Sequence, residues 1–96
     1  ENSSSSPFQA PKSWEKVKKV VVVILENTDF KDALARPSFA KFAEKGALLT
    51  KYFGVTHPSQ PNYLALIGGS TFGVQTDINV TLDEVHLGNL LQQKGK

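Results

Sequence analysis

The sequence predicts an α/β fold with a mostly parallel sheet, and three observations carry that prediction. Residues 20–25 form an unbroken run of β-branched and aliphatic side chains, typical of a strand buried on both faces. Helical spacing follows over residues 37–46 and again over residues 61–67. A second apolar stretch, residues 47–55, lies between them. Strands that alternate with helices in this way build a parallel sheet.

The elements of the first half follow from local signals. After the strand at 20–25, residues 29–34 suit a short helical turn. Pro37 suits the first position of the next helix, where a missing N–H costs nothing, and Gly46 suits its C-terminal cap. Phe39, Phe42 and Ala43 form an apolar stripe on that helix, which we interpret as core. Residues 47–55 are the second predicted strand.

The second half begins with a loop that feeds a helix. Pro61 suits the first helical turn, Ser59 or Gln60 falls at the cap position, and the pair Gly68 and Gly69 ends the helix. A capping-box pattern at residues 81–84 then predicts a last helix that runs to Gly95, with an apolar stripe formed by Leu87, Leu90 and Leu91.

Length and composition predict one globular domain that is incomplete. The chain has 96 residues, and parallel sheets covered by helices on both faces usually need more. Eleven basic against nine acidic residues give a net charge of +2, which calls for no nucleic-acid partner. We interpret the basic cluster of Lys12, Lys16, Lys18 and Lys19 as a solvated flank of the strand; the alternative is a patch that faces phosphate. The absence of cysteine excludes disulfides and thiolate metal sites.

The N-terminal residues and two N-glycosylation patterns suggest a secreted protein. Residues 1–13 are rich in serine and proline and predict a flexible leader, so the domain spans residues 14–96. No stretch approaches the roughly 20 apolar residues of a membrane span, and the chain starts at Glu1, as a processed chain does. Asn2 and Asn79 both begin N-glycosylation patterns, which favour a secretory route and an extracellular location.

Two clusters of residues could carry chemistry. Glu26 and Asn27 end the first predicted strand, where ligands bind in open α/β sheets; the alternative is that they open a turn. Ser59 falls at a helix N-terminus, where backbone N–H groups favour an anion and a hydroxyl is placed to attack it; the alternative is a simple cap. The oxygen atoms of all three side chains suit a hard divalent cation, although three ligands are too few.

Four other polar residues are of types that could take part in chemistry. Asp29 and Asp32 could reach the rim of the predicted cation site, but capping the turn after Asn27 is the simpler interpretation. His57 shares a side of the loop with Ser59 and could contact phosphate or act as an acid. His86, between Val85 and Leu87, is interpreted as a partly buried structural histidine.

Two motifs resemble a known family. Val-Val-Val-Ile-Leu-Glu-Asn-Thr-Asp-Phe at 21–30 and Thr-His-Pro-Ser-Gln-Pro-Asn-Tyr-Leu-Ala-Leu at 56–66 together resemble the N-terminal part of the phosphoesterase family of secreted acid phosphatases and phospholipase C enzymes, most closely the fungal-type acid phosphatases. That family belongs to the alkaline phosphatase superfamily, so the resemblance implies a three-layer sandwich. It covers about residues 17–96, and the two motifs are specific in combination.

The resemblance implies a role for each matching residue. Glu26 and Asn27 match the pair that binds a divalent metal ion, and Ser59 matches the nucleophile that also touches the metal. Asn62 matches an asparagine that helps to hold a phosphate oxygen. The implied reaction is hydrolysis of phosphate monoesters through a covalent phosphoserine. The family completes its metal site with later Asp and His residues, and Thr28-Asp29-Phe30 replaces a frequent His-Ser-Phe.

The sequence leaves two functions open. In the first, the chain is the N-terminal portion of a secreted phosphoric monoester hydrolase, inactive alone and completed by a C-terminal remainder. In the second, it is an inactive or repurposed fragment that self-associates through residues 20–25, which have high β-propensity and no charge. Binding of metal and phosphate at Glu26, Asn27 and Ser59 would distinguish the first from the second.

Overall fold

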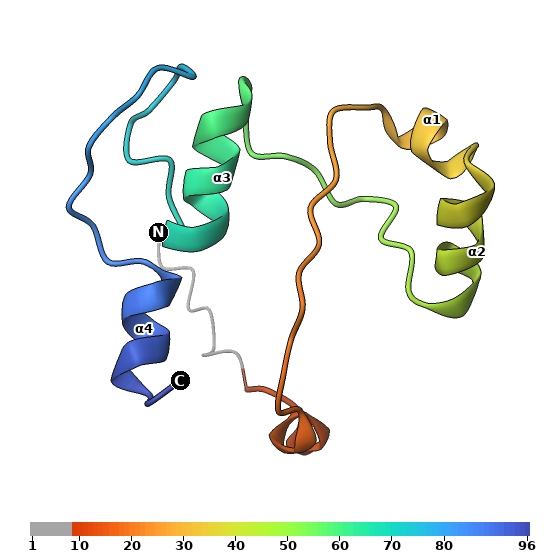
Figure 1. Cartoon of the computed structure of the whole chain (residues 1–96), viewed down its shortest axis with the longest axis horizontal. Helices are drawn as coiled ribbons and strands as arrows, with labels where there is room; N and C mark the ends of the chain where they lie inside the picture. The colour runs from red at the N-terminus through yellow and green to blue at the C-terminus, as the bar shows by residue number, and fades with distance from the viewer. Residues whose placement is uncertain (1–8) are drawn as a thin grey trace, which may run out of the picture. The chain divides into compact units, whose positions relative to one another are not determined.

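The computed structural model describes residues 9–96, and the chain divides into two compact units, Glu1–Gly46 and Ala47–Lys96. In the first unit a 3₁₀ turn, η1 (Lys12–Lys16), is followed by two short helices, α1 (Phe30–Leu34) and α2 (Pro37–Lys45), which contact each other (Figure 1). Pro37 occupies the first turn of α2 and Gly46 follows its last residue, as predicted. The leader predicted over residues 1–13 lies largely outside the described residues.

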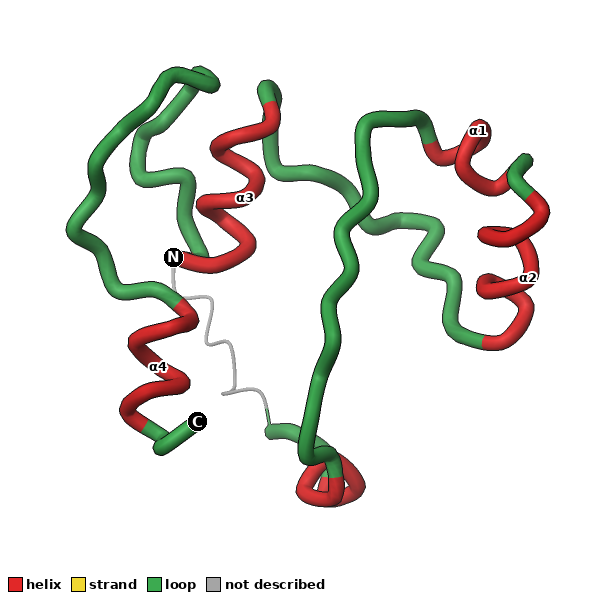
Figure 2. Tube along the Cα trace, viewed as in Figure 1, coloured by secondary structure: helices red, strands yellow, loops and turns green. Residues whose placement is uncertain are grey.

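The predicted α/β sheet is wrong for the part of the chain that the structure describes, because residues 9–96 contain no strand (Figure 2). Residues 20–25 are extended, but their side chains are between 49 and 77% exposed. The predicted second strand, residues 47–55, is turn and loop. A β-rich composition favours an extended backbone, but a strand also needs a neighbour to accept and donate its hydrogen bonds. Neither segment pairs with another strand within residues 9–96, so this part of the chain does not form the three-layer sandwich that the resemblance implies.

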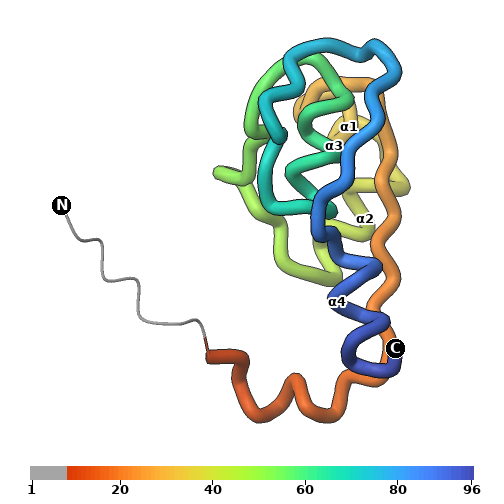
Figure 3. Tube along the Cα trace, turned by 90° about the vertical axis from the view of Figure 1, so that its left-hand side faces the viewer, coloured from red at the N-terminus to blue at the C-terminus, as the bar shows by residue number. Residues whose placement is uncertain are grey.

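The second unit is built around α3 (Ser59–Gly68) and α4 (Leu87–Gln93), which contact each other. Residues 69–86, here called the returning segment, join the two helices and run back along α3, as Figures 1 and 3 show from two directions. Gln60 ties this returning segment to the helix, because its side-chain Nε2 donates to the carbonyl of Ile78 at 2.8 Å. Gly69, with φ of 75°, ends α3 in the left-handed conformation that glycine adopts without cost, as the glycine pair predicted.

Two helix starts differ from the prediction. The cap of α3 is Pro58, so Ser59 is the first helical residue rather than the cap. The capping-box pattern at residues 81–84 does not start a helix, and α4 begins only at Leu87. His86 and Asn89 form the actual capping box: the His86 ring accepts from the Gly88 N–H at 3.1 Å, and Asn89 accepts from the His86 N–H at 3.0 Å.

Burial is slight throughout residues 9–96. Pro61, at the start of α3, is the one described side chain that is fully buried, and no apolar residue forms a closed core. Both predicted apolar stripes are open to solvent: Phe42, interpreted as core, is 76% exposed, and Leu90 in the last helix is 51% exposed. Local hydrogen bonds and caps therefore carry much of the order around α3, because apolar burial contributes little there.

Candidate functional site

Ser59 is presented to solvent at the N-terminus of a ten-residue helix. Its hydroxyl makes no hydrogen bond to any described residue, so the interpretation of Ser59 as a simple cap is not what the structure shows. The first backbone N–H groups of a helix lack intrahelical acceptors, and the helix dipole adds a partial positive charge there. An exposed hydroxyl at this position is suitably placed to meet an anionic group.

The loop before Ser59 is held by the side chain of Asn62. The Oδ1 atom of Asn62 accepts from the backbone N–H of Val55 at 2.8 Å and of Thr56 at 3.3 Å. Its Nδ2 group donates to the carbonyl of Thr56 at 2.7 Å and to that of Pro58 at 2.8 Å. One half-buried side chain thus fixes the path of four residues that lead into the helix.

Asp77 holds the same helix end from the returning segment. Its Oδ1 atom accepts from the backbone N–H of Gln60 at 2.8 Å, so a carboxylate far along the chain satisfies one of the donors that the helix start leaves open. No sequence pattern marks this contact, because 17 residues separate the two partners. Together, Asp77 and Asn62 hold the peptide groups on both sides of Ser59.

The predicted metal ligands Glu26 and Asn27 lie in the first unit, at the end of the extended apolar segment. Both side chains are exposed, and the peptide bond between them is cis, as is the bond between His57 and Pro58. Ser59 belongs to the second unit, so the predicted site that would join all three residues stays a prediction. Within residues 9–96 no three His, Cys, Asp or Glu side chains gather as a metal site would require.

The remaining candidates take separate places. Asp29 is the cap residue of α1 by position, but its side chain makes no cap hydrogen bond, and Asp32 lies in the first turn. His57 is exposed in the loop before Ser59, where its carbonyl accepts from the Thr56 hydroxyl at 3.3 Å. His86 is exposed rather than partly buried, and it caps α4.

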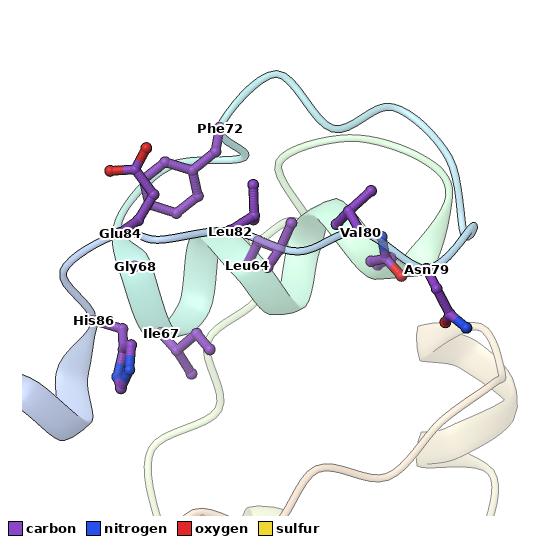
Figure 4. A pocket seen from close by; sticks show the side chains of 10 residues that line it. Leu64, Ile67, Gly68, Phe72, Asn79, Val80, Leu82, Glu84 and His86 are labelled. Carbon is purple, nitrogen blue, oxygen red and sulfur yellow. The ribbon is translucent and has the colours of Figure 1, made fainter.

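An open groove of about 350 Å³ runs beside α3 in the second unit. Apolar side chains of α3 and of the returning segment line most of it, with Glu84 and His86 toward one end (Figure 4). Its lining is formed by Gln60, Leu64, Ile67, Gly68, Phe72, Asn79, Val80, Leu82, Glu84 and His86. Asn79, the second predicted glycosylation site, is exposed at this groove, whereas Asn2 lies outside the described residues.

Ser59 therefore presents an exposed hydroxyl at the N-terminus of a helix, where the helix dipole favours a negatively charged group. Comparison with known proteins confirms the resemblance to acid phosphatases. A phosphate-repressible acid phosphatase of Penicillium chrysogenum is 51% identical over 59 residues, which are 62% of this chain and 14% of that protein. A probable acid phosphatase of Kluyveromyces lactis is 40% identical over 80 residues, 81% of this chain and 19% of that protein.

Another match has a different activity in its name. The phosphatidylinositol-3-phosphatase of Mycobacterium tuberculosis is 41% identical over 58 residues, 57% of this chain and 19% of that protein. The chain therefore spans less than a fifth of the length of these relatives. No family model and no solved structure matches it.

Proposed function

We propose that this chain supplies the nucleophile and part of the metal site of a phosphatase that hydrolyses phosphate monoesters. The observation that carries the proposal is the exposed Ser59 hydroxyl at the start of α3, in a segment similar to acid phosphatases. The finer points, which are the phosphoserine intermediate, the metal and the part that this chain plays in a larger enzyme, are our proposals.

Ser59 is proposed to attack phosphorus in line with the departing alcohol. A bond forms between the serine oxygen and phosphorus, the ester P–O bond breaks, and the alcohol leaves with a proton. Water then cleaves the phosphoserine and releases inorganic phosphate. The positive end of the α3 dipole, beside Ser59, would favour the negative charge that the phosphate oxygens gain as the reaction proceeds.

The donor set fits a divalent cation. Glu26 offers a carboxylate, Asn27 a carboxamide oxygen and Ser59 a hydroxyl oxygen, which are the hard ligands that such ions prefer. We propose that these three side chains would hold the ion and that residues outside this chain complete the ligand set. When bound, a divalent ion neutralises negative charge on the reacting groups and helps to deprotonate the serine.

We further propose that the chain is inactive alone and that the enzyme is secreted. The matched segments are only 14 and 19% of these relatives, so most of a comparable active site would lie elsewhere. The sequon at Asn79 lies on an exposed segment, as a glycosylated site must. Within the described residues no helix has the length and apolar character to span a membrane.

The exposure of residues 20–25 favours a second candidate, self-association. Six consecutive apolar side chains are all at least 49% exposed on an extended backbone. A second copy of the chain could pair with this segment edge to edge, with hydrogen bonds between the two backbones. In this alternative the chain is a catalytically inactive fragment or a repurposed domain, and its assembly depends on neither Glu26 nor Ser59.

The test compares two serines that stand in similar places. Ser59 and Ser38 are both exposed residues in the first turn of a helix. Ser59→Ala would be introduced into the complete protein as its source organism makes it. The variant should hydrolyse p-nitrophenyl phosphate about a thousandfold or more slowly than the parent. Ser38→Ala should leave the rate unchanged. Near-parental activity in Ser59→Ala would remove Ser59 from the proposed role.

A further inference from the structure

The side chain of Asn62 is fully occupied by the loop that precedes Ser59. A carboxamide has two N–H donors and one oxygen that accepts two hydrogen bonds. In Asn62 one N–H goes to the Thr56 carbonyl and the other to the Pro58 carbonyl, at 2.7 and 2.8 Å. The oxygen accepts from Val55 and Thr56. Neither side-chain N–H of Asn62 is therefore left to bind a phosphate oxygen.

Gly54 leaves the space that this arrangement needs. A Cβ atom at position 54 would lie 2.9 Å from the Asn62 oxygen, closer than such atoms approach in proteins. Any side chain at Gly54 would therefore push the carboxamide away from the N–H groups of Val55 and Thr56. Gly54, eight positions before Asn62, thus controls the same set of hydrogen bonds without belonging to α3.

The held loop ends directly at the proposed nucleophile. The Pro58 carbonyl that Asn62 binds belongs to the peptide group that joins Pro58 to Ser59. Fixing that peptide group fixes the direction in which the chain enters the helix and hence the position of the Ser59 Cα atom. Small misplacements of a nucleophile are costly in catalysis, because the reacting atoms must meet at a narrow range of distances and angles.

We propose that Asn62 is a positioning residue, which holds residues 55–58 so that Ser59 is presented in a fixed orientation, and that it does not itself bind phosphate. The proposal rests on the proposed function of Ser59 as nucleophile. It differs from the role that the family resemblance implies for Asn62, which is direct contact with a phosphate oxygen.

The first test measures amide hydrogen exchange in the full 96-residue chain by NMR. Asn62→Ala should speed exchange at Val55 and Thr56 by about tenfold, the change expected when one good hydrogen bond is lost. Gly54→Ala should do the same while leaving every residue of α3 in place. The matched control is Asn89→Ala, which removes a comparable backbone contact at His86 and should leave Val55 and Thr56 unchanged. Unaltered exchange in both Asn62→Ala and Gly54→Ala would overturn the proposal.

The second test separates positioning from phosphate contact, using hydrolysis of p-nitrophenyl phosphate by the native protein. Positioning predicts that Asn62→Ala and Gly54→Ala both lower kcat by about tenfold or more with little change in KM. Loss in Asn62→Ala with full activity in Gly54→Ala, or a rise in KM confined to Asn62→Ala, would overturn it. Complete absence of hydrolysis in the parent protein contradicts the proposed function instead, and the exchange experiment still decides the role of Asn62.

Discussion

Replacing Asp77 with alanine should loosen the first turn of α3. The substitution removes the acceptor of the Gln60 N–H, which the carboxylate holds at 2.8 Å. Hydrogen bonds to charged groups contribute about 1.5–3 kcal/mol, but water can replace this acceptor because the contact is exposed. Loss of a helix cap costs about 1 kcal/mol, and we expect that value here. It corresponds to about a fivefold increase in the population of the opened turn.

The charge and the hydrogen bond of Asp77 can be separated by a second variant. Asp77→Asn keeps an oxygen acceptor and loses the favourable interaction of a carboxylate with the helix dipole, so its effect should be about 0.5 kcal/mol. Asp83→Ala, an exposed aspartate of the same returning segment, serves as the control. The assay is amide exchange at Gln60 in the full chain, together with the Cα chemical shifts of α3.

Exchange at Gln60 that is equally slow in the parent and in Asp77→Ala would mean that the carboxylate does not hold the helix end. An effect of Asp77→Asn as large as that of Asp77→Ala would mean that charge, rather than an acceptor in the right place, holds the first turn.

Three further predictions concern other parts of the chain. Val22→Lys should reduce self-association in light scattering without changing the circular dichroism, because Val22 is 69% exposed; unchanged association would exclude residues 20–25 as the contact. Gly69→Ala should cost about 1–2 kcal/mol and fray the end of α3 in chemical shifts, because φ is 75° there, and normal shifts would contradict this. His86→Ala should lower the helicity of α4 by removing the acceptor of the Gly88 N–H, at a cost of about 1 kcal/mol; unchanged shifts at residues 87–93 would contradict it.

Local signals in the sequence predicted helices better than they predicted strands. Pro37 at the start of α2 and the glycine pair at the end of α3 were placed correctly, because each acts through its own backbone conformation. The strand predicted at residues 20–25 failed because β-branched side chains favour an extended backbone without supplying a partner to pair with. The capping-box pattern at residues 81–84 failed because the same residue types also occur in extended segments.

The candidate site, like the fold, could be predicted only in part from the sequence. Ser59 could be placed near a helix start from Pro61 and the polar loop before it, although its position within the helix was off by one residue. The family resemblance implies a role for Asn62, but no sequence pattern indicates that its carboxamide turns back onto Val55 and Thr56. The glycine at position 54 is the one residue that could have indicated this contact, because it leaves room for the carboxamide. The contact between Asp77 and Gln60 could not be predicted, because it depends on how the chain returns along α3.

The central claim, that Ser59 is the nucleophile of a metal-dependent phosphatase, is tested most directly by trapping the intermediate. Native protein isolated from its source would be incubated with p-nitrophenyl phosphate and a divalent cation, quenched in acid and digested for mass spectrometry. We predict phosphate on the peptide that contains Ser59, and its loss in Ser59→Ala or in the presence of a chelator. Hydrolysis that proceeds with no phosphate on Ser59, or that a chelator leaves untouched, would contradict the claim.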